Sequence, residues 1–344
     1  MRIEDFDYEL PQRAIAQRPL PERDASRLLV LDRGLADLRH RVFRELPEVL
    51  CRGDLLVVNR SRVFPARLLG RRETGGQAEV LLLRDLGDDL WEALLRPGRK
   101  LRPGASIRIS DGLWVRVESR TSGPDGRRRV RLLARGESAP AAIARLGHVP
   151  LPPYIRRRDD AADRDRYQTT YAREPGSVAA PTAGMHFTAP LLDRARERGI
   201  EVAEVLLHVG PGTFKPVAVR EVADHRVAPE PFVVPPETAA AVLRARSRGG
   251  RVVAVGTTTA RALETAATRE GGVGAQAGET DLVILPGHRF RAIDALLTNF
   301  HLPRSSLLLL VAAFAGRERV LGAYRAALAA GYRFYSYGDA MLIL

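Results

Sequence analysis

Two polar loops carry the residues best suited to chemistry. The first reads Pro181-Thr182-Ala183-Gly184-Met185-His186-Phe187 and the second His208-Val209-Gly210-Pro211-Gly212-Thr213-Phe214. Histidine exchanges protons near neutral pH, threonine offers a hydroxyl, and glycine lets the backbone approach a ligand. Each loop alone fits equally well a tight turn with a hydrogen-bonded histidine. Together they favour a binding site in which His186 and His208 are candidate acids or bases.

Four further polar clusters lie at the ends of apolar segments. They are Asn59-Arg60-Ser61-Arg62, Gly256-Thr257-Thr258-Thr259, Thr298-Asn299-Phe300-His301-Leu302-Pro303 and Tyr335-Ser336-Tyr337-Gly338-Asp339. The glycine and threonines at 256–259 begin a predicted helix, where free N–H groups and hydroxyls suit a carboxylate or a phosphate. An ordinary helix cap is the alternative interpretation. Other side chains able to transfer a proton are Asp224, His225, Glu230, His301 and Asp339.

The elements that must position these loops alternate between apolar strands and helices. Strands are predicted at 54–58, 200–207, 251–255, 281–285 and 295–297, and helices near 189–198, 237–247, 258–268 and 305–315. This alternation predicts an α/β domain, in which ligands gather at the carboxyl ends of the strands. The segment 271–278 has the composition of a mobile loop.

From about Arg67 to Arg135 the pattern changes to short alternating segments. They are 78–83, 91–95, 106–109, 113–118 and 130–133, separated by turns such as Gly75-Gly76 and Gly123-Pro124-Asp125-Gly126. Such spacing predicts a small antiparallel β-barrel. A helix at 139–146 and a stiff proline-rich segment at 150–154 return the chain. The predicted fold is therefore a large mixed-sheet α/β domain (1–65 and 149–344, discontinuous) with an inserted β-barrel domain (66–148).

The composition and the absence of certain motifs indicate which partners, metal sites and reactions are to be expected. The 344 residues carry a net charge of +13, and Lys100 and Lys215 are the only lysines. Arginine suits phosphate groups, so the excess favours a nucleic-acid partner, although the bias of a GC-rich coding sequence would also explain it. One cysteine and no HExxH or CxxC spacing predict no metal site. The sequence contains neither a Walker motif nor a GxGxxG motif, so it gives little support to ATP hydrolysis or nicotinamide chemistry. We expect a cytoplasmic protein with no membrane partner, because no signal or spanning segment is found.

The chain resembles the S-adenosylmethionine:tRNA ribosyltransferase-isomerase family of queuosine biosynthesis. The resemblance rests on Arg62-Val63-Phe64-Pro65-Ala66-Arg67-Leu68, Val178-Ala179-Ala180-Pro181-Thr182-Ala183-Gly184, Ala313-Phe314-Ala315-Gly316 and on residues 5–11, 53–57, 150–155, 167–169, 186–187, 208–210, 212–214, 256–258, 298–303 and 332–341. It implies an α/β domain interrupted by a β-barrel. It also implies transfer and isomerisation of the ribosyl part of S-adenosylmethionine onto 7-aminomethyl-7-deazaguanine in the tRNA anticodon arm. Epoxyqueuosine forms, and adenine and methionine leave.

The resemblance implies no cofactor other than S-adenosylmethionine as co-substrate, and we expect a monomer. We hypothesise that His186 and His208 are catalytic, that residues 256–258 bind the methionyl carboxylate, and that Asp339 faces the cationic amine or sulfonium. Asn59, Arg62, Asn299 and His301 would hold the deazaguanine or the sugar. The full set expected to contact substrate is Asn59, Arg62, Thr182, Gly184, Gly210, Gly212, Thr213, Glu230, Gly256, Thr257, Thr258, Arg261, Asn299, His301 and Asp339.

One departure from the family pattern bears on specificity. Where the family usually reads Asp-His-x-Met-His-Ser-Glu, this chain has Asp224-His225-Arg226-Val227-Ala228-Pro229-Glu230. Two alternatives therefore stay open. One is a divergent S-adenosylmethionine-dependent ribosyltransferase that uses a non-tRNA acceptor. The other is a noncatalytic RNA-binding protein, against which the several polar loops argue.

Overall fold

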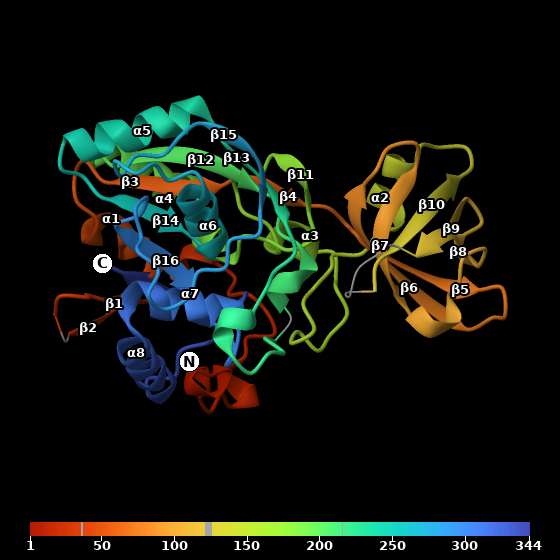
Figure 1. Ribbon diagram of the computed structural model, residues 1–344, viewed down its shortest axis with the longest axis horizontal. Coiled ribbons are helices and arrows are strands. Elements are labelled where there is room, and N and C mark those ends of the chain that lie inside the picture. The colour runs from red at the N-terminus through yellow and green to blue at the C-terminus, as the bar shows by residue number, and fades with distance from the viewer. Residues whose placement is uncertain (36, 121–125, 215) are drawn as a thin grey trace.

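The computed structural model describes residues 1–35, 37–120, 126–214 and 216–344. Figure 1 shows two parts, a large sheet covered by helices and a smaller β-barrel that lies beside it. Most of the turn predicted at 123–126, and Lys215, lie outside the described residues. The observed architecture confirms the predicted fold class, a mixed α/β sheet combined with an antiparallel barrel.

The large sheet has nine strands in the order β15-β13-β12-β3-β14-β16-β17-β1-β2. Their bounds are β1 Arg27–Leu31, β2 Leu38–Val42, β3 Leu55–Asn59, β12 Glu201–Leu207, β13 Glu230–Val234, β14 Val252–Val255, β15 Gln276–Thr280, β16 Ala295–Asn299 and β17 Ala340–Ile343. The four central strands β12, β3, β14 and β16 are parallel. Their carboxyl ends consequently lie along one edge of the sheet.

Other segments reach the same edge through the outer strands. β13 and β17 run antiparallel to their inner neighbours, so both begin at this edge, and β1 begins there because it is parallel to β17. The register pairs Asn299 at the end of β16 with Ala340 at the start of β17. The loop 335–339 therefore lies beside the end of β16, although the two are far apart in the sequence.

Helices cover both faces of the sheet (Figure 1). One face packs on α5 (Pro236–Ser247), α6 (Thr257–Thr265), α7 (Ser306–Ala315) and α8 (Arg317–Ala329), and the other on α1 (Leu46–Val49), α4 (Ala189–Glu197) and the 3-10 helix Thr182–His186. Burial on both faces explains why the central strands are continuous apolar runs. The first four residues of β3, for example, all have at most 1% of their surface exposed.

The barrel closes in the order β10-β7-β6-β5-β8-β9. Its strands are β5 Arg67–Arg72, β6 Gln77–Asp85, β7 Leu90–Arg96, β8 Ser106–Ser110, β9 Leu113–Arg120 and β10 Arg128–Ala134. α2 (Ala139–Leu146) packs against the barrel core, and it begins and ends at the predicted residues. The short strands β4 (Ser61–Val63) and β11 (Glu174–Ser177) pair with each other, and α3 spans Asp163–Arg166.

Two predictions about residues 271–285 are wrong. The strand is Gln276–Thr280, which includes part of the predicted loop, and 281–285 forms no strand. β15 is an edge strand with four exposed residues, and it is held by backbone hydrogen bonds to β13. Its neighbours Leu282 and Ile284 are apolar because they pack on the core. Within the described ranges, no helix has the length and apolar character needed to cross a membrane.

Candidate functional site

A cavity opens at the edge where the central strands end. The hollow contains about 630 Å³ of space, part of which is open solvent at its mouth. Its lining consists of Tyr154, Ala179, Ala180, Pro181, Thr182, Ala183, Val209, Gly256, Thr257, Thr258, Thr298, Asn299, Phe300, His301, Leu302, Ser305, Leu307, Tyr335 and Ser336. None of these described residues is Asp, Glu, Lys or Arg. The lining is mainly apolar, and its polar side chains are hydroxyls, the amide of Asn299 and the imidazole of His301.

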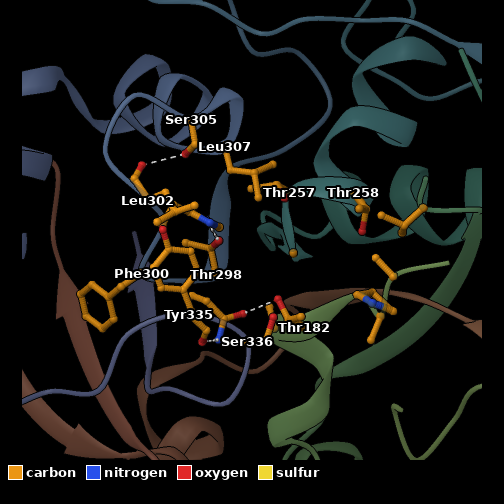
Figure 2. Close-up of a pocket in the computed structure, with 18 of the residues that line it drawn as sticks. Thr182, Thr257, Thr258, Thr298, Phe300, Leu302, Ser305, Leu307, Tyr335 and Ser336 are labelled. Carbon is orange, nitrogen blue, oxygen red and sulfur yellow. Dashed lines mark hydrogen bonds between the residues drawn. The ribbon is translucent and has the colours of Figure 1, made fainter. Parts of the chain in front are cut away.

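The start of helix α6 forms one wall of this pocket. Gly256 has a φ of 91°, a backbone conformation that favours glycine, and it turns the chain from β14 into the helix. The first bond along the helix runs from the N–H of Ala260 to the Gly256 carbonyl at 3.1 Å. The N–H groups before it are therefore available to a ligand. Figure 2 shows Thr257 and Thr258 across the pocket from Thr182.

Asn59 supports this wall from behind and does not line the pocket. Its amide nitrogen donates to the Leu207 carbonyl at 2.9 Å and, more weakly, to Thr258 Oγ1 at 3.4 Å. Its oxygen accepts from the N–H groups of Ser61 and Leu207, both at 3.1 Å. Because both ends of the amide are used, Asn59 joins the ends of β3 and β12 to the helix α6 turn. Its hydrogen-bonding groups are thus already occupied within the protein, and the expected contact with substrate stays a prediction.

A buried chain of hydrogen bonds forms the opposite wall. Thr182 Oγ1 donates to Asn299 Oδ1 at 2.8 Å, and Asn299 Nδ2 donates to His186 Nε2 at 3.2 Å. Since Nε2 accepts, the proton of His186 is on Nδ1, which donates to Ser26 Oγ at 2.9 Å. Burial, reinforced by the charge of Arg333, lowers the pKa of His186 to about 3. His186 is therefore a neutral imidazole behind the pocket, facing a second, smaller hollow.

His301 is the only histidine among the described lining residues. Its Nε2 and Thr298 Oγ1 are 2.7 Å apart, and its backbone N–H donates to the Tyr324 hydroxyl at 3.1 Å. Burial lowers the pKa of His301 to about 3. It contributes a neutral, fixed hydrogen-bonding group.

His208 lies just beyond the pocket, next to the lining residue Val209. Its ring packs so closely on Gly176 that a Cβ there would lie 2.6 Å from His208 Cε1. Its buried Nδ1 finds no hydrogen-bond partner among the described residues. Burial lowers the pKa of His208, and the nearby charge of Glu174 opposes that shift. His208 thus has an imidazole nitrogen that the fold leaves unused.

The loop that follows His208 is held by a buried ion pair. Glu230 Oε1 accepts from the Gly210 N–H at 2.7 Å, and its other oxygen pairs with Arg261. Arg261 also donates to the Leu282 carbonyl at 2.9 Å. None of these side chains lines the pocket, so the pair Glu230–Arg261 shapes the loop. Gly212 is exposed, and the side chain of Thr213 lies outside the described part of the structure.

Three other predicted ligands are also placed away from the pocket lining. The carboxylate of Asp339 accepts from the N–H groups of Arg27 and Arg333, at 3.0 and 2.7 Å, and burial raises its pKa. Arg62 is exposed on β4. Gly184 is a packing residue, because a Cβ there would lie 2.0 Å from the Tyr171 hydroxyl oxygen. Contact of Asp339 with a bound sulfonium finds no support in this geometry.

The departure from the family pattern lies outside the pocket as well. Ala228 and Pro229 are both exposed, and His225 Nε2 lies 2.6 Å from Ser306 Oγ at the start of α7. The replaced residues therefore do not reshape the lining.

Sequence reasoning missed an aromatic wall made by Tyr154 and Tyr335, whose ring centroids are 4.3 Å apart. Tyr335 has a φ of 74°, which is uncommon for a residue other than glycine. Its buried hydroxyl has no hydrogen-bond partner among the described residues. Such strained residues cluster at functional sites. The polar cluster at 335–339 was a usable signal, but it directed attention to the carboxylate of Asp339.

No group of three or more His, Cys, Asp or Glu side chains among the described residues is arranged to hold a metal ion.

Comparison with known proteins gives a consistent result over the whole chain. A family model described as "Queuosine biosynthesis protein" matches residues 3–343. The S-adenosylmethionine:tRNA ribosyltransferase-isomerase of Moorella thermoacetica is 56% identical over 346 residues, which cover 100% of both chains. Its namesake from Anaeromyxobacter sp. strain Fw109-5 is 55% identical over 347 residues, 100% of this chain and 99% of the relative. A crystal structure of S-adenosylmethionine tRNA ribosyltransferase from Thermotoga maritima is 40% identical, covers 99% of this chain and 100% of its own, and has a TM-score of 0.56.

Proposed function

The chain belongs to the queuosine biosynthesis protein family, and on that premise we propose that it is a tRNA ribosyltransferase-isomerase that uses S-adenosylmethionine. The proposed reaction moves the ribosyl part of S-adenosylmethionine onto 7-aminomethyl-7-deazaguanine at the wobble position of tRNA. Isomerisation of the sugar gives epoxyqueuosine, and adenine and methionine are released. A tRNA substrate would be met in the cytoplasm, which is the location we propose.

The observation that carries the proposal is the pocket that joins the start of helix α6 to the 3-10 helix containing Thr182 and to the end of β16. S-adenosylmethionine combines a carboxylate with a sulfonium and an adenosine, so its pocket needs an anion site and neutral polar and apolar walls. The α6 wall supplies N–H groups and the hydroxyls of Thr257 and Thr258 for the carboxylate. The opposite wall supplies Thr182, Tyr335 and Ser336 for the nucleoside.

The chemistry needs proton transfer at the carbon next to the sulfonium. A sulfonium acidifies the ribose C5′ protons, so a base at this carbon forms an ylide, and an acid helps adenine leave. Of the two histidines expected to be catalytic, His208 directly precedes the lining residue Val209 and has a ring nitrogen, Nδ1, without a hydrogen-bond partner among the described residues. We assign proton transfer to His208. We assign His186 a positioning role, because it acts on the pocket through Asn299.

The decisive experiment follows adenine release and nucleoside mass. The purified full-length chain is incubated with S-adenosylmethionine and tRNA that carries 7-aminomethyl-7-deazaguanine. Release of adenine, with a mass gain on the modified base that matches a ribosyl-derived group, supports the proposal. Adenine release with a free small-molecule amine but not with tRNA would favour a different acceptor. Binding of tRNA without any S-adenosylmethionine cleavage would favour the noncatalytic alternative.

A further inference from the structure

The turn between barrel strands β7 and β8 holds an unusual concentration of positive charge. Four cations lie within seven residues, and all four side chains are exposed: Arg96, Arg99, Lys100 and Arg102. Leu101, at 1% exposure, inserts into the barrel core and fixes the turn. Backbone bonds from Lys100 N to the Pro97 carbonyl at 3.1 Å and from Gly104 N to the Val117 carbonyl at 2.7 Å hold its shape. The burial of Leu101 and these two hydrogen bonds therefore anchor the backbone that carries the four cations.

These four side chains differ from most of the other basic side chains on the barrel. Arg67, Arg84, Arg108, Arg116 and Arg131 each form an ion pair with a carboxylate. The side chains of the turn 96–102 form no ion pair or hydrogen bond with the described residues. The turn thus groups four basic side chains that no carboxylate among the described residues pairs with.

The pocket itself cannot supply the attraction that a polyanionic substrate needs. Its described lining contains no Lys or Arg. Affinity for tRNA comes largely from cations that meet phosphates and release counterions. The phosphate contacts must therefore lie elsewhere on the molecule.

Topology places the barrel on the pocket side of the sheet. Strand β3 ends at the pocket edge with Asn59, and the chain continues through β4 into the first barrel strand at Arg67. Arg84, near the end of β6, forms an ion pair with Glu279 of β15, so that end of the barrel meets the large sheet. Arg96 pairs with Glu79, six residues before the end of β6. Arg96, where the turn begins, therefore lies about 17 Å along β6 from the contact of Arg84 with the large sheet.

We propose that the turn 96–102 is a docking surface for the phosphate backbone of the tRNA, remote from the pocket that receives the wobble base. The inference rests on the proposed function for the identity of the nucleic acid. An RNA arm that reaches into the pocket extends outward past the barrel, where the four cations meet its phosphates. They position the substrate and take no part in the chemistry.

The test removes the four charges and compares the result with a matched control. The variant carries Arg96→Gln, Arg99→Gln, Lys100→Gln and Arg102→Gln. The control carries Arg248→Gln, Arg269→Gln, Arg289→Gln and Arg319→Gln, which removes the same number of exposed charges from the large α/β part. Binding of tRNA carrying 7-aminomethyl-7-deazaguanine is measured without S-adenosylmethionine between about 50 and 300 mM salt. Circular dichroism and S-adenosylmethionine binding verify that both variants are folded.

The turn variant is expected to bind this tRNA at least tenfold more weakly than the control near 150 mM salt, with a salt slope lower by up to about 3. In turnover its KM for tRNA rises, while kcat and the KM for S-adenosylmethionine stay close to the control values. Equal tRNA affinities of the two variants would overturn the docking surface. Absence of turnover in the wild-type chain would instead overturn the proposed function, and the binding comparison would still decide the role of the turn.

Discussion

Thr257→Val tests whether the start of helix α6 receives the carboxylate of S-adenosylmethionine. The substitution keeps the shape of the side chain and removes one hydroxyl that forms no hydrogen bond with the described residues. A hydrogen bond to a charged group contributes about 1.5–3 kcal/mol. Its loss is therefore expected to raise the KM for S-adenosylmethionine roughly 10- to 150-fold. The kcat should change little, because a contact made equally in the ground state and the transition state affects KM alone.

The assay measures initial rates of adenine release at saturating tRNA. Each enzyme is tested with S-adenosylmethionine and with its decarboxylated analogue, which lacks the group that the hydroxyl is expected to bind. If the Thr257 hydroxyl binds the carboxylate, removing both groups lowers the binding free energy by much less than the sum of the two separate losses. Thr257→Ser should restore most of the affinity.

The matched control is Thr259→Val in the same helical turn. The Thr259 hydroxyl donates to the Val255 carbonyl at 2.7 Å and does not line the pocket. Its removal should leave the KM for S-adenosylmethionine unchanged. The reasoning fails if Thr257→Val weakens the two substrates by the same factor, since the hydroxyl would then act on another part of the molecule.

Three further predictions follow from the packing around the pocket. Gly176→Ala should cost about 1–3 kcal/mol in a denaturant titration, because the new Cβ meets the His208 ring and the backbone φ is 145°. Arg261→Met leaves the buried Glu230 carboxylate without its cation and should lower stability by about 3–5 kcal/mol, read from the shift in the unfolding midpoint. In pH profiles of kcat/KM, wild-type activity should fall as acid protonates His208, below its ordinary pKa of about 6.5; His208→Asn should remove this acid limb, and His301→Asn should leave its position unchanged.

The location of the site could be predicted from the sequence because the central strands are apolar throughout. Strands β3, β12, β14 and β16 were all recognisable, and polar loops follow each of them. Parallel strands must bring their carboxyl ends to one edge, so the convergence of those loops follows from topology alone. The polar edge strand β15 could not be recognised, since its residues are held by backbone hydrogen bonds and not by apolar burial.

The roles of individual polar residues could not be predicted in the same way. Asn59, Glu230 and Asp339 have the side chains expected of ligands, yet each accepts backbone N–H groups in the structure. Residue type states how many hydrogen bonds a group can form but not whether the fold already uses them. The converse holds for Tyr335, which lies in one of the polar clusters but was not predicted to contact substrate, and whose buried hydroxyl has no hydrogen-bond partner among the described residues.

The absence of acidic residues from the described pocket lining has a chemical consequence. A carboxylate beside a bound sulfonium would strengthen binding, but it would also offset the positive charge that makes the neighbouring C5′ protons acidic. We infer that this pocket binds S-adenosylmethionine through its carboxylate at helix α6 and leaves the sulfonium uncompensated. Asp339 is held by two backbone N–H groups and lies outside the lining. On this inference, the free energy of binding comes mainly from the carboxylate of S-adenosylmethionine and is kept apart from the sulfonium charge that activates C5′.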